Sequence, residues 1–371
     1  MSSTVELKPR FDYIDQFRGL VVILMLLDHA SYYFNAVWDQ IDPLNPLFDS
    51  WGQFALRYVS YLCAPGFLVM AGAMVWWAFR KKSAQGENKW TIRRQLMLRG
   101  LFLVLLQVTW VNSSWGGFSE FKPGHLGIIA CIGISMILLT LVVDFHWIVQ
   151  TLLALLLLVI HPFLLKIPYD PSVTDLKMIL MQTFVDAGEF NKYPVLPWFA
   201  LAILGSAMAH GWLQSWKTDK QKIAWSTGIG IAAIAIAVLI RMGRGYGNIF
   251  PFSEIGSYSF FFDQKYPPSL YLSLWCFGWV LIFITLFIIL NRLIPKALWL
   301  FSIPGKTALF FYGMHIAIMG VFVKRMDFMY REGGVKETLI AFVIMYAIML
   351  PLCFWFYNIK RKSKNFIIKM I

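Results

Sequence analysis

Hydrophobic residues in this sequence occur in long, nearly unbroken runs that are separated by polar segments. Ten runs approach or exceed the roughly 20 apolar residues that a helix needs to cross a bilayer. Strands of a transmembrane barrel alternate over roughly ten residues, so these runs are too long and too continuously apolar for a barrel. The pattern predicts an all-α polytopic membrane protein, a bundle of about ten transmembrane helices. We expect them at 17–38, 53–78, 97–115, 125–143, 146–166, 195–213, 224–241, 269–291, 306–323 and 338–358.

Composition supports a single domain embedded in a lipid bilayer. Of the 371 residues, 58% are hydrophobic and only 14% are charged. We find no internal repeat, low-complexity linker or soluble domain, so residues 1–371 are expected to form one transmembrane domain. The absence of a repeat gives no support to a transporter built from two related halves.

The net charge of +13 is best explained by membrane topology. In a soluble protein such a charge would suggest nucleic acid, but in a polytopic chain Lys and Arg mark the cytoplasmic loops. With a cytoplasmic N-terminus, 21 of the 33 Lys and Arg residues fall on the inner side. We therefore expect both termini in the cytoplasm and no nucleic-acid partner.

The first span, "IDQFRGLVVILMLLDHASYYF", carries ionisable residues at its entrance and in its middle. Arg18 and His29 are eleven residues apart, which is about 20° from a whole number of helical turns, so both project from one face. The rise between them is about 16.5 Å, roughly half of a hydrocarbon core. We expect Arg18 to hold an anionic group at the cytoplasmic edge and His29 to transfer protons near the midplane. The alternative is a snorkelling arginine with a histidine bonded to a neighbouring helix.

Two further ionisable residues could act with His29. Asp28 points about 100° away from it, so a relay within the helix is not expected. Asp28 either pairs with another helix or takes part in catalysis. His315 lies midway along the ninth span, at a depth that would let it meet His29, and Tyr312 shares its face. The alternative for His315 is a packing histidine that donates to a carbonyl.

A basic segment, "RKKSAQGENKWTIRRQLMLRG", follows the second span. Its first charges are explained by topology, but Arg99 lies inside the third span and must face protein or water. Guanidinium groups bind phosphates through paired hydrogen bonds. We therefore predict that Arg93, Arg94 and Arg99, together with Arg18, bind the phosphates of coenzyme A. No glycine-rich phosphate loop is present, so nucleotide hydrolysis has no support.

Three polar residues near the outer ends of the spans are candidates for binding an acceptor substrate. They are Asn112 in the third span, Trp198 in the sixth and Tyr266 before the eighth, and Tyr312 is a fourth candidate deeper in the bundle. The prolines of "YPPS" are expected to begin the eighth helix, where a missing N–H costs nothing. Most of the Trp and Tyr residues also fit an interfacial belt. No histidine pair has the spacing of metal ligands, so no metal is expected.

Five segments, in order from the first to the ninth span, carry a resemblance to a known family: "IDQFRGLVVILMLLDH", "RYVSYLCAPGFLVMAGA", "LPWFALAILG", "KYPPSLY" and "IPGKTALFFYGMH". The chain resembles bacterial relatives of heparan-α-glucosaminide N-acetyltransferase, within the membrane acyltransferases that include the acyltransferase-3 family. The resemblance implies transfer of an acyl group, with acetyl favoured, from cytosolic acyl-CoA to a sugar or amino-sugar acceptor at the outer face. It also implies an essential histidine in the first helix and the inner membrane of a bacterium. The oligomeric state is left open, with a homodimer as one option.

Three functions remain to be weighed. An acyltransferase would use His29 as general base or as the site of an acyl-histidine intermediate. A proton-coupled transporter of a sugar or lipid would use Asp28, His29 and His315 as a relay. A scaffold subunit would tolerate loss of His29. Because arginines gather at one cytoplasmic mouth, the acyltransferase is the preferred hypothesis.

Overall fold

The computed structural model describes residues 12–38, 50–119, 121 and 124–371, and their regular structure is helical apart from isolated bridges. In this part of the chain nine helical segments are long and apolar enough to cross a membrane, and the shorter α6 is a tenth apolar helix. The predicted all-α polytopic membrane fold is thus confirmed. The ten predicted spans correspond to α1 (Asp12–Phe34), α3 (Cys63–Ala84), α4 (Lys89–Leu106), α6 (Ile128–Val142), α7 (Trp147–Leu164), α9 (Val195–His210), α10 (Asp219–Met242), α12 (Leu270–Leu293), α14 (Ala308–Met319) and α15 (Val335–Lys362).

Some helices run beyond the apolar segments that predict them, whereas α6 and α7 are slightly shorter than predicted. α2 (Trp51–Tyr58) continues through the 3₁₀ turn Val59–Leu62 into α3, which makes one helical segment from 51 to 84. α4 begins at Lys89, eight residues before the predicted start of its span. Hydropathy locates only the part of a helix that lies in lipid, whereas Lys, Arg and Gln are good helix formers that extend it into water.

Short helices join the long ones and were not predicted, because they contain too few residues for a membrane span. They are α8 (Leu176–Phe184), α11 (Tyr258–Phe261), α13 (Trp299–Lys306) and α16 (Phe366–Met370). α5 (Asn112–Trp115) is also short, but it completes the helical segment 89–115 and lies within the predicted third span. The prediction that the "YPPS" prolines begin α12 is wrong. That helix begins at Leu270, and the Ser269 hydroxyl caps it by accepting from the backbone N–H of Leu272 at 3.0 Å. A serine side chain satisfies an N–H at this end, which proline cannot do.

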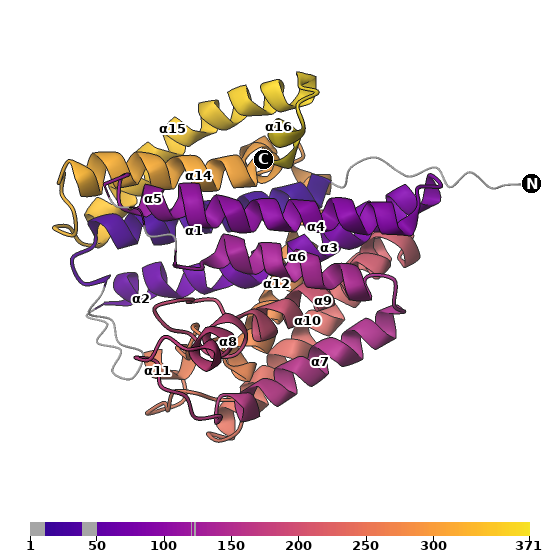
Figure 1. Ribbon diagram of the computed structural model, residues 1–371, viewed down its shortest axis with the longest axis horizontal. Helices are drawn as coiled ribbons and strands as arrows, with labels where there is room; N and C mark the ends of the chain where they lie inside the picture. The colour runs from indigo at the N-terminus through magenta and orange to yellow at the C-terminus, as the bar shows by residue number, and fades with distance from the viewer. Residues whose placement is uncertain (1–11, 39–49, 120, 122–123) are drawn as a thin grey trace, which may run out of the picture.

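Central and peripheral helices differ in burial. Along the segment that contains α9, 89% of the most apolar window is buried, whereas the value is 22% for each of α7, α10 and α15. In Figure 1, α14 and α15 lie along one side of the bundle and α7 and α10 along the other, while α1 and α3 run between them. The peripheral helices therefore present apolar side chains to lipid, and the central ones form the core.

Glycines allow the central helices to approach one another closely. A side chain at Gly19 of α1 would collide with the backbone carbonyl of Phe301 in α13, and one at Gly305 would collide with the carbonyl of Asp15. α3 and α9 meet in the same reciprocal way at Gly72 and Gly205. Small residues at such crossings are typical of helix packing in membranes, where dispersion contacts between backbones stabilise the interface. These contacts hold α1 and α3 in place around the candidate site.

Candidate active site

Two histidines from distant parts of the chain meet inside the bundle. Nδ1 of His29 in α1 lies 2.7 Å from Nε2 of His315 in α14, and the two rings stack. Nδ1 of His315 lies 2.6 Å from the carbonyl oxygen of Phe311 in the preceding turn. His29 is 9% exposed and His315 is fully buried. The depth argument from the sequence allowed the rings to meet, and the structure brings them together.

These contacts fix where the hydrogens lie in the neutral pair. A carbonyl oxygen can only accept, so Nδ1 of His315 carries a hydrogen and its Nε2 presents a lone pair. His29 must then donate from Nδ1 to that lone pair. Nε2 of His29 is left as the unprotonated nitrogen, which is the atom that can accept a proton from a substrate. We assign this arrangement from the hydrogen-bond network.

Aromatic rings surround the histidine pair. The indole of Trp115 lies edge-on to His29 with ring centroids 4.8 Å apart. The ring of Tyr312 lies 5.9 Å from His29 and 5.9 Å from His315, and Tyr312 is itself buried. Rings packed this closely keep bulk water away from the imidazoles, and electrostatic interactions become stronger in such surroundings.

A pocket of about 420 Å³ approaches this pair from one end of α1. This volume lies within the ~300–1,000 Å³ range of small-molecule sites. Cationic side chains and apolar side chains both contribute to its walls. The cations are Arg18, Arg99, Lys306 and Lys360, and the apolar residues include Phe67, Met70, Met74, Leu103 and Met136.

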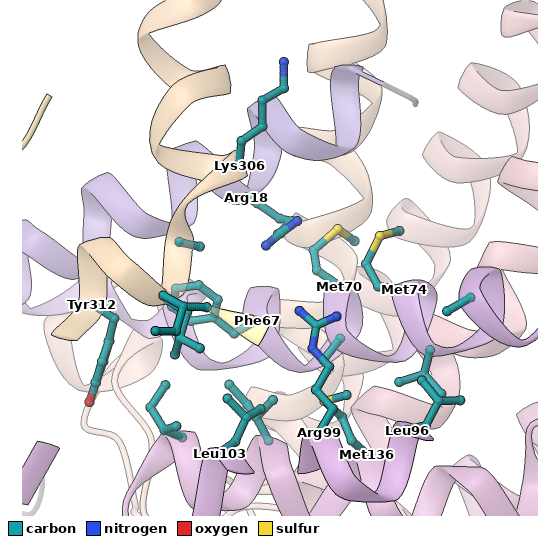
Figure 2. Close-up of a pocket in the computed structure, with 18 of the residues that line it drawn as sticks. Arg18, Phe67, Met70, Met74, Leu96, Arg99, Leu103, Met136, Lys306 and Tyr312 are labelled. Carbon is teal, nitrogen blue, oxygen red and sulfur yellow. The ribbon is translucent and has the colours of Figure 1, made fainter. Parts of the chain in front are cut away.

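The two arginines of the pocket face one another. Figure 2 shows the guanidinium groups of Arg18 and Arg99 pointing toward each other across the pocket, whereas the Lys306 ammonium points away, toward its ion pair with Asp12 at 3.8 Å. Arg18 also pairs with Asp15 at 3.4 Å, and Arg99 donates to the carbonyl of Met370 at 3.5 Å. Two like charges in one pocket favour an anion between them. Phosphate is one anion that guanidinium groups bind through paired hydrogen bonds.

Two helices, α1 and α14, show the same order from the pocket to the histidines. On α1, Arg18 lines the pocket and His29 lies about three turns further along. On α14, Tyr312 lines the pocket and His315 lies one turn beyond it. On α3, residues 67–78 contribute to the walls. His29 is not itself a lining residue; Tyr312 lines the pocket and contacts both imidazole rings.

Arg93 and Arg94 lie elsewhere, although the sequence grouped them with Arg99. The Arg93 side chain ties α4 to α6, since Nε donates to the Thr140 carbonyl at 2.9 Å and Nη2 pairs with Asp144 at 3.3 Å. Arg94 is exposed, and neither residue lines the pocket. Of the four residues predicted to bind coenzyme A, the structure places Arg18 and Arg99 together.

The predicted acceptor residues occupy two different places. Asn112 is buried and engaged locally, since it accepts from Gln107 at 2.8 Å and donates to the His125 carbonyl at 2.9 Å. The Tyr266 hydroxyl lies 3.0 Å from the Tyr193 hydroxyl, and the ring of Tyr193 lies 5.7 Å from Trp198. Tyr266 and Trp198 therefore belong to one aromatic group, and Asn112 does not join them.

Asp28 does not form the helix-to-helix pair that the sequence suggested. Its Oδ1 atom is buried and finds no hydrogen-bond partner among the described residues. Lys265, in the loop before α12, is close enough to interact electrostatically with both Asp28 and His29. Within the described ranges, no group of three or more His, Cys, Asp or Glu side chains could hold a metal ion.

Sequence reasoning missed three lysines that the structure places near the site. Lys306 and Lys360 line the pocket, and Lys265 lies near the histidines. In the sequence, Lys306 and Lys360 are explained as cytoplasmic charges that set the topology, and Lys265 falls in a loop. Lys265 and Lys306 do fall within "KYPPSLY" and "IPGKTALFFYGMH", so membership of those segments was the available signal.

Comparison with known proteins agrees with this architecture. No curated protein matches the chain. A family described as heparan-alpha-glucosaminide N-acetyltransferase, catalytic, matches residues 10–246, which is more than half of the chain. The matched region contains His29, Arg18 and Arg99. With its apolar helices and this match, the protein is an integral membrane member of a transferase family: the chain belongs to the heparan-α-glucosaminide N-acetyltransferase catalytic family.

Proposed function

We propose that the protein transfers an acetyl group from acetyl-CoA to a sugar or amino-sugar acceptor, with His29 as general base. One observation carries the proposal: the pocket extends from two facing guanidinium groups to Tyr312, which contacts both imidazole rings. Acetyl-CoA carries phosphates at one end and a thioester at the other. A site for it needs cations at one end of the pocket and a basic nitrogen near the other end.

The donor would bind with its phosphates on Arg18 and Arg99, with Lys306 and Lys360 adding positive charge at the same end. The pantetheine arm would lie along the Met- and Phe-lined wall, where its methylene groups find apolar contacts. The thioester would then reach the Tyr312 end. Arg93 and Arg94 have no part in this proposal, because their side chains lie outside the pocket.

In the chemical step the acceptor hydroxyl or amine attacks the thioester carbonyl carbon. Nε2 of His29 takes the proton of that hydroxyl or amine as the new C–O or C–N bond forms. The tetrahedral intermediate collapses, the C–S bond breaks, and the imidazolium returns the proton to the sulfur of coenzyme A. His315 holds His29 in the required tautomer, the role that a third group has in other nucleophile–base–orienter sets.

The distribution of charge supports a cytoplasmic position for the donor end. Lys and Arg concentrate on the side where both termini are predicted. We propose that the enzyme acts in the inner membrane of a bacterium and acetylates an envelope glycan at the outer face. Only the acetyl group would cross the membrane.

The proposal is tested with purified protein and acetyl-CoA that carries a labelled acetyl group, incubated with amino sugars and with glycans extracted from bacterial envelopes. We expect label on an acceptor, one free coenzyme A thiol for each acetyl transferred, and slow hydrolysis when acceptor is left out. Absence of all three would contradict the proposal. Sugar uptake into proteoliposomes driven by a pH gradient, without any acyl-CoA, would instead establish the transporter.

A further inference from the structure

Lys265 is a buried cation to which the reaction above gives no role. It is 7% exposed and lies in the loop between α11 and α12. Its ammonium lies 5.2 Å from the ring of Tyr61 and 5.3 Å from that of Tyr266. It donates to the Ser60 carbonyl at 3.4 Å, a long hydrogen bond. An ammonium has three hydrogens to donate, so one long bond leaves donor capacity unused.

Asp28 supplies the opposite charge nearby. Its buried Oδ1 accepts no hydrogen bond from any described residue, and a carboxylate oxygen buried in this way is costly. Burial alone would lower the pKa of Lys265, but Tyr266 and the Asp28 carboxylate outweigh it and raise the pKa above its usual value. Lys265 is therefore charged at neutral pH. The two groups interact electrostatically, yet no ion pair within 4 Å joins them in the described chain, so neither has its full set of polar partners there.

This pair of charges lies beyond the donor pocket along two helices. On α1, Arg18 lines the pocket and Asp28 lies ten residues further along. On the segment that contains α3, residues 67–78 line the pocket, and Ser60, which bonds Lys265, comes seven residues before them. Lys265 also lies within electrostatic range of His29. The two charges therefore lie near the level of His29, about three helical turns along α1 from Arg18.

We propose that Lys265 and Asp28, which lie outside the donor pocket, are positioning residues that hold the acceptor against Nε2 of His29. This inference rests on the transfer reaction proposed above. A hydroxyl or a neutral amine can accept from Lys265 and donate to Asp28 at once, whereas a carboxylate can only accept and an ammonium can only donate.

The surrounding side chains indicate the class of acceptor. Tyr266, Tyr193 and Trp198 form a connected aromatic group beside Lys265, and the indole Nε1 of Trp198 is buried with no partner in the described residues. Flat apolar rings with polar atoms at their edges suit a molecule that has C–H faces and several hydroxyl groups. The site therefore fits a polyhydroxylated ring presented as a neutral nucleophile.

Lys265→Met tests the proposal, since methionine keeps the length of the side chain and removes the charge. We expect KM for the acceptor to rise about tenfold to a hundredfold, the usual effect of losing a hydrogen bond to a charged group. Affinity for acetyl-CoA and acceptor-independent hydrolysis of acetyl-CoA should change less than about twofold. Lys265→Arg, which keeps the charge, should recover part of the lost acceptor affinity. Asp28→Asn should also raise KM for the acceptor.

Two results would overturn the inference while leaving the acetyltransferase intact. One is an unchanged KM for the acceptor in Lys265→Met. The other is a Lys265→Met protein that melts at the wild-type temperature and loses acetyl-CoA binding and hydrolysis by the same factor by which its KM for the acceptor rises. A merely structural role would affect both substrates in this way. The double variant with Asp28→Asn should show less than the sum of the two single effects if both groups hold one acceptor. A wild-type protein that neither transfers nor hydrolyses acetyl groups would contradict the proposed function itself, and this inference with it.

Discussion

The hydrogen on Nδ1 of His315 determines which nitrogen of His29 is basic. Because the Phe311 carbonyl holds that hydrogen, the lone pair of His29 lies on Nε2, away from its partner ring. A single histidine in a hydrophobic bundle could adopt either tautomer. The second ring therefore selects the reactive tautomer of the first.

Replacement of His315 by Ala should lower kcat about 10²–10⁴-fold, since His29 would lose the contact that fixes its tautomer. KM and binding of acetyl-CoA should change little, because His315 does not line the pocket. Steady-state kinetics with labelled acetyl-CoA, together with a direct binding measurement, separates the two effects. Full activity in this variant would show that the histidine pair is a packing contact only.

Arg99→Gln should weaken acetyl-CoA binding about tenfold to a hundredfold and leave kcat at saturating donor nearly unchanged, because a charge-assisted hydrogen bond to phosphate is lost far from the reacting atoms. Arg94→Gln is the matched control, since Arg94 lies on the same helix but does not line the pocket. Equal weakening by both substitutions would indicate a general effect of surface charge and contradict a specific phosphate site.

The sequence predicts the positions of single site residues better when they lie on regular helices than when they lie in loops. The eleven-residue spacing of Arg18 and His29, and the depth of His315, follow from helix geometry. Lys265 could not be placed in this way, because a loop has no period from which the position of a side chain can be calculated.

Among the helices, the crossing of α3 and α9 depends on glycine. Gly72→Ala would place a methyl group against the Ala202 backbone carbonyl, which cannot move without displacing α9. We expect a loss of roughly 1–3 kcal/mol or more in the free energy of unfolding, the usual cost of overpacking. Thermal melting in detergent measures the loss.

Gly228→Ala in α10 is the control for this substitution. No atom lies within 4 Å of the position that its methyl group would take. Alanine favours a helix over glycine by up to about 1 kcal/mol, so this variant should melt at or above the wild-type temperature. A Gly72→Ala protein as stable as Gly228→Ala would contradict the close crossing of α3 and α9.

Hydropathy finds the long helices, because their signal extends over roughly 20 residues of apolar sequence. It does not find α13 or α16, which have eight and five residues. α16 matters for the site, because the Met370 carbonyl at its end accepts from Arg99. Such a contact joins residues 271 positions apart and depends on the tertiary fold, which no local pattern encodes.

For the whole molecule, the account requires that donor and acceptor approach from opposite faces of the membrane. In sealed vesicles of known orientation, acetyl-CoA should support transfer only when it is added to the cytoplasmic face, because coenzyme A is too highly charged to cross lipid. Labelled acetyl groups should then appear on an acceptor confined to the other face. Transfer that requires both substrates on one face would contradict a path through the bundle.

The number of spans and the topology of charges can be predicted for the molecule as a whole, since both depend on the bilayer as solvent. The pocket cannot, because it forms where α1, α3, α4, α6, α14 and the end of α15 converge. Which faces of those helices meet is decided by close contacts such as those at Gly19 and Gly305. The sequence shows the glycines without showing their partners.

The most direct test of the account is His29→Ala, with acetyl-CoA binding and acetyl transfer measured on the same purified sample. His29 lies beyond the pocket that would hold the donor, so binding should remain within about twofold of wild type. Transfer should fall by about 10²–10⁴-fold or more, since the lone pair on Nε2 of His315 faces Nδ1 of the removed ring and does not lie where Nε2 of His29 was. Near-normal transfer by a folded His29→Ala protein would contradict the mechanism.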